Sequence, residues 1–365
     1  MTVLATRRDE ARAVFAGHGL PTRRVEEWKY SDLKTALGPA ASEIDGGRSA
    51  AWSLGPLPPG VESFDLSRDA VPAWALPRMG ADPMGAASLA FARAGVALRV
   101  TGAAAEPLRL DLSQAGHLRV VLVLEAGASA TLVEHAAAAS WRNAGVDIVL
   151  GEGARLDHIR LSPAAPDAVL VAEYFILVAA RARYGAHFAD FGAKLSRAGL
   201  QIALAGKDAQ AHLSGISVLG GTAHADITTH VIHRKGDTRS TQLFKKLAGG
   251  KARAIYQGKV TVAKGADGAD SLQTAKALLV SETAEADLKP ELEIFADDVK
   301  CAHGAAIGDL DTEQIFYLRS RGIPEAQARS LLLRAFLEDA LAEIADQGQR
   351  DAVRAALDDA LKAVA

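Results

Sequence analysis

The chain is poor in cysteine: its 365 residues include one, Cys301. A single cysteine excludes an intrachain disulfide, and it also excludes the zinc and iron–sulfur modules that are built from paired cysteines. Any site that requires several thiolate ligands must therefore obtain the others from a second chain.

Signatures of nucleotide and metal binding are missing as well. Gly250 and Lys251 are followed by Ala252, where a Walker A motif needs serine or threonine, and GEGARL at 151–156 lacks the third glycine of the dinucleotide fingerprint. Ten histidines leave a non-thiolate metal site open, but the HExxH and EF-hand spacings do not occur. Any nucleotide hydrolysis is therefore expected in a partner.

Neither a large net charge nor a long hydrophobic run is present. A formal net charge of -3 gives no overall attraction to nucleic acid or to anionic membranes. The apolar run at 169–180 is too short to span a bilayer, and charges interrupt the apolar residues of segment 1–15. We therefore expect no signal peptide, no membrane contact, no nucleic-acid partner and a cytoplasmic protein.

The first 95 residues read as a helical region followed by a linker. Helical spacing in residues 1–40 is broken at Gly19, Leu20 and Pro21. Glycine and proline then become frequent from about 38 to 83, which predicts an extended linker or wrapping arm, and a short helix is expected over 84–94.

Short apolar runs punctuated by glycine follow, from about 96 to 308. The turn glycines Gly127, Gly153 and Gly206 are separated by 26 and 53 residues, close to one and two copies of one step, although Gly265 follows at 59. Repeated pairs of short strands favour a solenoid, specifically a parallel β-helix, over the alternative of a jelly roll or other β-sandwich. Four runs carry the pattern: 122–135, 148–161, 202–215 and 260–273.

Residues 309–365 return to helical spacing. Asp311 or Thr312 can cap a first helix, Gly322 ends it, and Pro324 begins the next. Two interpretations stay open for the apolar stripes: the helices close the end of the solenoid, or they offer a surface to a partner. The stripes consist of Ala328, Leu331, Leu332, Ala335, Phe336 and Leu341, and of Val353, Leu357, Leu361 and Val364.

Two groups of polar residues suggest chemistry but favour structural roles. Residues 233–259 are basic and carry two aromatics, which is more typical of a solvated face or a patch for an acidic partner than of a nucleic-acid surface. His224, His230 and His233 have metal-like spacing, yet strand alternation directs His230 and His233 to opposite faces.

Cys301 and His303 form a stronger candidate. In an extended strand both side chains lie on one face about 7 Å apart, and thiolate with imidazole makes half of a metal site. We expect Lys300 to lower the pKa of the thiol modestly and Gly304 to allow close approach of another backbone. A buried, inert cysteine beside an incidental histidine is the alternative.

The segment LKPELEIFADDVKCAHGAAIGDLDTEQIFYLRSRGIPEAQARSLLLRAF, at 288–336, closely resembles the C-terminal block of the SufB/SufD family, and RVEEWKYSDL at 24–33 resembles its N-terminal signature. Residues 229–262 also resemble the family core, so the resemblance is strongest from about 215 to 340. VKCAHGA at 299–305 is similar to the SufD branch rather than the SufB branch. No functional position carries over within 35–200.

The resemblance implies a right-handed parallel β-helix between helical terminal regions, in a scaffold subunit of SUF-type iron–sulfur cluster assembly. It implies pairing with SufB through the β-helix, a possible homodimer of the isolated chain, and a non-catalytic role. Cys301 and His303 would share a cluster-building site with SufB, and the chain alone would hold no stable cofactor. The C-terminal helices, within 312–347, would dock the ATPase SufC through Phe316, Tyr317, Leu331, Leu332 and Phe336.

Two rivals to this interpretation remain. In one, the solenoid is an enzyme with Cys301 as nucleophile and His303 as base, although parallel side chains in i, i+2 register suit shared ligation of a third body better than a direct hydrogen bond. In the other, the protein is a structural adaptor and Cys301 is inert.

Overall fold

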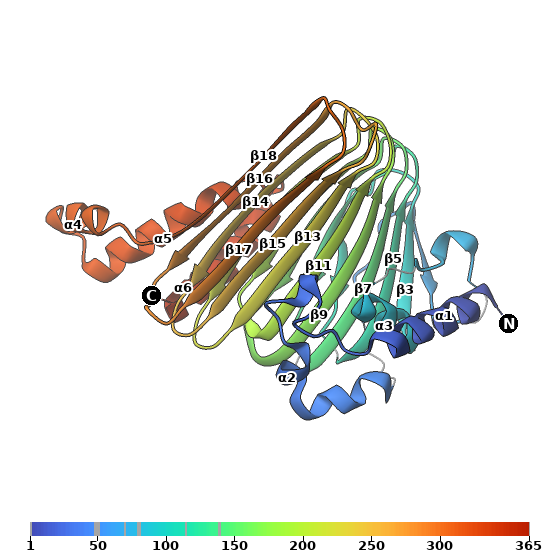
Figure 1. Cartoon of the computed structure of the whole chain (residues 1–365), viewed down its shortest axis with the longest axis horizontal. Coiled ribbons are helices and arrows are strands. Elements are labelled where there is room, and N and C mark those ends of the chain that lie inside the picture. The colour runs from blue at the N-terminus through green and yellow to red at the C-terminus, as the bar shows by residue number, and fades with distance from the viewer. Residues whose placement is uncertain are drawn as a thin grey trace.

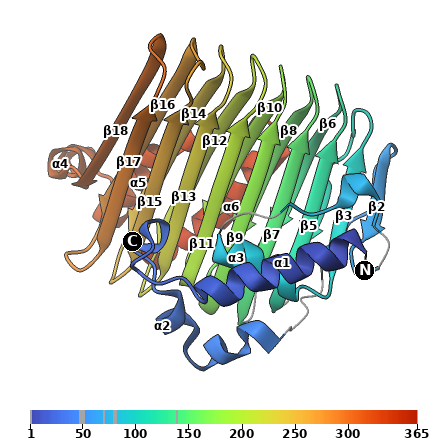
Figure 2. The same cartoon turned by 45° about the vertical axis from the view of Figure 1, so that its right-hand side comes forward.

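The computed structural model describes residues 2–46, 52–68, 71–78, 82–113, 115–137 and 140–364. Parts of the predicted linker, at 47–51, 69–70 and 79–81, lie outside these residues. The described chain is mainly β, with helices toward both ends (Figures 1 and 2). None of its described helices is long and apolar enough to cross a membrane.

Two sheets face each other along the length of the described chain. One has the strand order β1 (Ser53–Leu54), β4 (Leu108–Asp111), β6 (Ser129–His135), β8 (Arg155–Ser162), β10 (Arg183–Asp190), β12 (Gln210–Leu219), β14 (Arg239–Ala248), β16 (Ala269–Leu279), β18 (Val299–Asp309). The other has the order β2 (Val61–Asp65), β3 (Gly95–Val100), β5 (Gly116–Leu124), β7 (Trp141–Leu150), β9 (Ala165–Val178), β11 (Ala193–Leu204), β13 (His224–His233), β15 (Arg253–Val262), β17 (Glu285–Ile294).

The chain crosses from one sheet to the other at every step after β3. Each strand from β5 to β16 pairs in parallel with the strand two places before it and the strand two places after it. The short strands β1 and β2 pair antiparallel, with β4 and β3. The fold is a parallel β-solenoid, which confirms the predicted fold class, and the sandwich alternative is wrong.

Alternation along each strand separates the interior of the solenoid from its outer faces. In β9, Ala172, Tyr174 and Ile176 belong to the main apolar core, whereas Glu173 and Phe175 point outward between them. Because the strands stack in register, each interior side chain lies on its counterpart in the next coil. The outward-facing side chains of each sheet are not part of this core, so they are either covered by other elements or exposed on the surface.

The turns explain the loose glycine step in the sequence. A left-handed backbone conformation, with φ between 57° and 77°, recurs every 26 to 29 residues at Gly127, Gly153, Arg181, Asp208, Asp237 and Gly265. Gly206 lies in the corresponding turn as predicted, but the left-handed residue of that turn is Asp208, since aspartate tolerates the conformation. Gly206 is required for another reason: an added Cβ would lie 2.1 Å from the backbone nitrogen of Ala180.

We expect Gly206→Ala to destabilise the solenoid by about 1–3 kcal/mol, since the methyl group would meet rigid backbone of the preceding coil. Gly102→Ala is the matched control, because an added Cβ there has no neighbour within 4 Å and should change stability by less than ~0.5 kcal/mol. Urea unfolding followed by circular dichroism measures both. Equal midpoints for the two variants would contradict the contact.

The N-terminal elements lie on the outer face of the sheet that contains β9 and β11 (Figures 1 and 2). Trp28 is fully buried there, with its ring 4.2 Å from the guanidinium of Arg197. The predicted helix at 84–94 is found slightly earlier in the chain. The elements are α1 (Val3–His18), η1 (Glu26–Trp28), α2 (Leu33–Leu37), η2 (Gly38–Gly46), η3 (Ala73–Ala75) and α3 (Pro83–Phe91).

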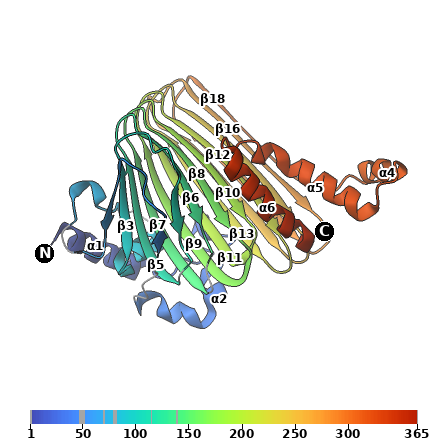
Figure 3. The same cartoon turned by 180° about the vertical axis from the view of Figure 1, so that it is seen from behind.

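Three helices follow the solenoid: α4 (Thr312–Ser320), α5 (Glu325–Leu341) and α6 (Gln347–Val364). Asp311 caps α4 and Gly322 adopts a left-handed conformation after it, as predicted. The interpretation that these helices close the end of the solenoid is wrong, because α5 and α6 cover the outer face of the other sheet while α4 projects away from it (Figure 3). Their buried residues include Ala328, Leu333, Leu337, Leu341, Val353, Leu357 and Leu361.

Candidate functional site at the end of the solenoid

The last coil of the solenoid consists of β17 and β18. Within the described residues β18 pairs with β16 alone, and β17 pairs with β15 alone, so both are edge strands. Most residues of β18 are exposed, unlike those of the inner strands. The coil therefore presents unpaired backbone groups and the end of the apolar core, which elsewhere in the solenoid are covered by the next coil.

Cys301 lies on β18 with its thiol toward the interior of the solenoid. It is half-buried, packs against the main core together with Val299, and is paired in register with Ser271 of β16. Burial and the negative charge of Asp270 raise the pKa of the thiol, against a smaller lowering effect of the Ser271 backbone. The prediction that Lys300 lowers this pKa is wrong, because Lys300 alternates to the opposite face of the strand, beside Asp270.

His303 lies two residues further along β18 and is exposed. The strand geometry places it on the same face as Cys301, and its register partner on β16 is Gln273. An added Cβ at the neighbouring Gly304 would have no atom within 4 Å, so the backbone is open to approach at this point. The structure thus brings the predicted pair together at an accessible edge.

Polar residues continue behind this pair into the interior, and sequence reasoning missed them. Ser240, Ser271 and Cys301 stack in one row, with 2.8 Å between the two serine hydroxyls, and Gln242 and Gln273 stack below His303 in the next. Both side-chain amide atoms of Gln273 are buried without a hydrogen-bond partner among the described residues. Such unmet groups cost about 1–3 kcal/mol each, which marks this row as more than packing.

A signal for these rows was present in the sequence. Ser-x-Gln occurs at 240–242 and again at 271–273, and Cys-x-His follows at 301–303. The spacings of 31 and 30 residues match one coil of the solenoid at this end. Aligning the chain on the coil length, rather than on turn glycines, would have placed the three pairs in one column.

The pair does not amount to a complete metal site. Within the residues that the structure describes, no group of three or more histidine, cysteine, aspartate or glutamate side chains is arranged to hold a metal ion. Cys301 and His303 are two side chains of good ligand type, and further ligands would have to come from outside the chain.

Apolar side chains surround the candidate site. Leu272, Ile294, Phe295 and Ile307, on or beside the last strands, are 40–62% exposed. Leu288 and Leu292 of β17 are half-buried at the end of the core. Exposed clusters of this kind are typical of protein interaction surfaces.

A second exposed apolar surface lies on α4 and the start of α5. Phe316 is 73% exposed, Tyr317 56% and Leu331 44%, and Tyr317 and Leu332 line a shallow groove between the two helices. Phe336 is half-buried instead, with the ammonium of Lys245 4.6 Å from its ring. Of the five residues predicted for docking, three are therefore exposed, Leu332 is half-buried in the groove, and Phe336 packs against the solenoid.

The basic stretch at 233–259 is largely paired within the chain. Lys245 and Lys246 are buried, and three further cations form ion pairs with acidic residues of the adjacent strand. These pairs are Arg239 with Asp270, Arg253 with Asp287 and Lys259 with Glu293. The stretch therefore contains much less unpaired positive charge than its sequence suggests.

His224, His230 and His233 do not come together in the structure, as strand alternation predicts for His230 and His233. His233 is fully buried in the interior and contacts Thr238 and Ser240, whereas His230 lies on the outer face, 2.9 Å from the hydroxyl of Thr261. His224 is 3.2 Å from the hydroxyl of Ser31 in the N-terminal region. Each has a structural partner of its own.

Comparison with known proteins gives a consistent result. The family model for "SUF system FeS cluster assembly, SufBD core domain" matches residues 109–336. The iron-sulfur cluster assembly protein SufD of Escherichia coli is 35% identical over 243 residues, 66% of this chain and 57% of that protein. A SufBD family protein of Synechocystis is 32% identical over 238 residues, 62% of this chain and 52% of that protein.

"Protein ABCI7, chloroplastic" of Arabidopsis thaliana is 29% identical over 244 residues, 65% of this chain and 51% of that protein. The chain thus spans somewhat more than half the length of these relatives. The matched region includes most strands of the solenoid, the strand that carries Cys301 and His303, and α4. Because the family model covers more than half of the chain, the chain belongs to the SufBD family of iron–sulfur cluster assembly proteins.

Proposed function

We propose that this chain is a SufD-type scaffold subunit of a cytoplasmic SUF complex, in which it pairs with SufB, docks the ATPase SufC and helps to build and pass on iron–sulfur clusters. The observation that carries the proposal is the position of Cys301 and His303 on an accessible edge strand at the end of the solenoid. The cluster is cargo that the complex holds transiently, and the chain alone binds no stable cofactor.

Ligand number supports a shared site. A cluster typically takes four ligands, mostly thiolates, and this chain has one thiolate with one imidazole beside it. The remainder comes from SufB across the interface. Free Cys301 is a thiol with a raised pKa, so we expect the isolated chain to bind metal weakly and the docked partner to complete the site.

The surroundings of the pair support pairing through the last coil. An edge strand can add a strand from a second chain, and the exposed Phe295 and Ile307 supply apolar area to bury. Gly304 leaves room for the partner's backbone. The same surface would serve a homodimer when the chain is isolated.

The enzyme alternative is disfavoured by the thiol itself. A catalytic cysteine needs a lowered pKa, and burial together with Asp270 raises the pKa of Cys301. His303 shares a strand face with it, and no carboxylate of the described residues is hydrogen-bonded or ion-paired to it to orient the imidazole. A thiol that ligates a metal releases its proton as the metal binds, so the raised pKa weakens binding at neutral pH without excluding that role.

Pairing can be tested at the last coil. The double variant Phe295→Ser with Ile307→Asp should weaken SufB binding at least tenfold, because it removes apolar area and introduces a charge at the edge. Val3→Ser is the control, since Val3 is 60% exposed on α1, on the N-terminal part of the chain. Size-exclusion chromatography and titration with SufB provide the measurement, and unchanged binding by the double variant would refute pairing at this surface.

A further inference from the structure

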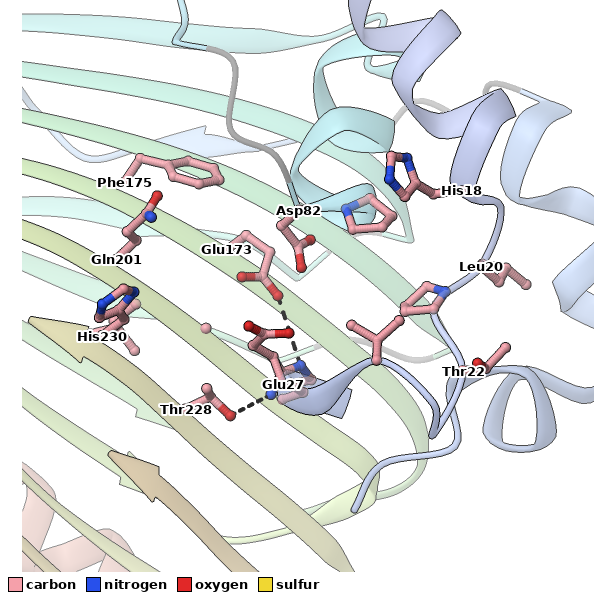
Figure 4. Close-up of a pocket in the computed structure, with 16 residues that line it drawn as sticks. His18, Leu20, Thr22, Glu27, Asp82, Glu173, Phe175, Gln201, Thr228 and His230 are labelled. Atoms are coloured by element: carbon pink, nitrogen blue, oxygen red, sulfur yellow. Dashed lines mark hydrogen bonds and ion pairs between the residues drawn. The ribbon is translucent and has the colours of Figure 1, made fainter. Parts of the chain in front are cut away.

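A pocket of about 390 Å³ lies on the outer face of the solenoid, away from the last coil, under the segment that follows α1 (Figure 4). Its floor is formed by outward-facing residues of β9, β11 and β13, and its roof by residues 18–27 and the start of α3. Neither the family comparison nor the Cys301 site accounts for this space.

The pocket combines an apolar wall with a polar floor. Leu20, Pro21, Val25, Pro83 and Phe175 supply the wall. The floor consists of Glu173, Arg197, Gln201, Thr228 and His230. Such a lining is typical of small-molecule sites, where apolar contacts give affinity and a few polar groups fix the orientation.

Arg197 is held in place by other residues. Its guanidinium donates to Thr228 at 2.7 Å, lies 3.2 Å from a carboxylate oxygen of Asp226, and stacks on the ring of Trp28. Its distance to Glu173 is 3.9 Å, too long for a hydrogen bond. The positive charge at the floor is therefore directed mainly to Asp226.

Glu173 is left without a comparable partner. It is 5% exposed, and its Oε1 atom has no hydrogen-bond partner among the described residues. Its register neighbours on β7 and β11 are both glycines, Gly145 and Gly199, and a Cβ at Gly199 would lie 2.0 Å from the other carboxylate oxygen. The carboxyl group thus occupies space that the flanking strands keep free.

Negative charge dominates around this group. Asp82 and Glu27 lie near Glu173 in the pocket (Figure 4), and Asp226 adds further negative charge, against the guanidinium of Arg197. Asp82 already accepts hydrogen bonds from the first turn of α3 and from Trp28. A buried carboxylate with acidic neighbours and only a long contact to Arg197 is costly, and a bound cation would relieve that cost.

We propose that this pocket binds a small organic cation, an amine or guanidine on a short apolar stem, with Glu173 as its counter-ion. The cationic head donates hydrogen bonds to the Glu173 carboxylate, and the stem lies against Phe175 and the residues of the roof. A metal ion is a poorer fit, because no group of three metal-ligating side chains is assembled here in the described chain. Since roof and floor come from different parts of the chain, the ligand would fasten the N-terminal segment to the solenoid.

The titratable groups of the pocket predict that the affinity for a cation depends on pH. Burial, followed by the charges of Asp82, Asp226 and Glu27, raises the pKa of Glu173 well above its usual range despite the opposing effect of Arg197. His230 contributes little positive charge at neutral pH, because burial lowers its pKa, and His18 lies at the roof. A cation binds the ionised form of Glu173, so affinity should rise with pH.

The test uses the full chain and two probes, agmatine for a free amine and the tripeptide Gly-Lys-Gly for a lysine side chain of a partner. Calorimetric titration at pH 6 and pH 8.5 should show saturable binding of at least one probe, tighter at the higher pH; which probe binds identifies the source of the cation. Glu173→Gln should weaken binding at least tenfold and remove the pH dependence. Glu282→Gln, an exposed carboxylate in the turn before β17, is the control.

A stability measurement separates this site from a purely structural ion pair. Because the folded-state pKa of Glu173 is raised, the folded chain binds more protons than the unfolded chain above pH ~4.5, and stability falls as pH rises through that window. Glu173→Gln should therefore raise the melting temperature more at pH 8 than at pH 5. Destabilisation by this variant would mean that Glu173 serves Arg197, and would overturn the proposal.

A variant that leaves Glu173 intact guards against misfolding. Val25 lines the roof with 37% of its surface exposed, and Val25→Trp should obstruct the pocket without altering its floor. Loss of probe binding in this variant supports the site. Absence of binding by either probe to the unmutated chain, or full binding by Val25→Trp and Glu173→Gln, would refute it.

Discussion

A complex reconstituted with the Cys301→Ser variant should build clusters at less than a tenth of the rate of the unmutated complex. The reason is the difference between the two side chains as ligands. A thiolate is a soft donor that iron–sulfur clusters prefer, whereas a serine hydroxyl of nearly the same shape ionises far less readily. Since the chain has no second cysteine, no other residue can replace the lost thiolate.

His303→Ala should have a smaller effect, because imidazole is a secondary ligand for clusters and water can substitute for it. Ala302→Ser is the matched control for both, since it lies between them on β18 but faces the opposite side. Absorbance of the reconstituted cluster gives the rate, and size-exclusion chromatography verifies assembly. Normal complexes that build clusters at the unmutated rate without Cys301 would establish the structural-adaptor alternative.

The raised pKa of Cys301 adds a pH dependence. A thiol must lose its proton before it binds metal, so with a pKa above its usual value fewer chains carry the thiolate at neutral pH. Cluster formation by the unmutated complex should therefore accelerate between pH 7 and pH 8.5. Replacing Asp270 by asparagine removes the negative charge that helps to raise this pKa and should shift the profile toward lower pH.

The sequence was informative where residue type and local geometry coincide. Glycine-punctuated pairs of short strands and the family resemblance were enough to predict the solenoid, and Asp311, Gly322 and Pro324 marked the helix ends because capping is a local property. The turn step was less visible, because Arg181 and Asp208 adopt a conformation that is usually associated with glycine.

Features that depend on packing between distant segments could not be predicted from the sequence. The buried stripe of α5 includes Leu333 and Leu337, whereas the stripe read from the sequence included Leu331, because a leucine-rich helix offers several equivalent faces and tertiary contacts choose among them. The pocket around Glu173 depends equally on long-range contacts. Its roof, at 18–27 and 82–83, lies at least 90 residues before Glu173, the first residue of its floor, so no local pattern could connect them.

Deletion of the C-terminal helices is not a clean test of SufC docking, because two of them also cover the solenoid. Deleting residues from 311 onward would remove α5 and α6, which cover Ile216, Val218 and Leu247 on the outer face of the solenoid. The truncated chain would expose those apolar side chains together with Lys245, which would also lose its ion pair with Asp339 of α5. It would lose partners through misfolding or aggregation, so loss of binding would carry little information.

Substitutions on the exposed part of α4 and α5 avoid that problem. Phe316→Ser, Tyr317→Ser and Leu331→Ser combined should reduce SufC binding at least 100-fold while leaving SufB binding and the melting temperature unchanged. Each side chain is largely exposed in the free chain, and burying one in an interface contributes roughly 1.5–3 kcal/mol at most, so the loss of three exceeds the 2.8 kcal/mol or so that a 100-fold change requires.

Gln327→Ser is the matched control, because Gln327 is exposed on α5 but polar. Phe336→Ser should behave differently from both, since Phe336 packs under Lys245 and its loss should lower stability before it lowers SufC affinity. Comparing these variants distinguishes residues that bind SufC from residues that hold α5 on the solenoid. α4 and the start of α5 project from the solenoid, and the rest of α5 packs on the sheet (Figure 3). Retention of SufC by the triple variant in a pull-down would show that SufC does not dock through these three side chains.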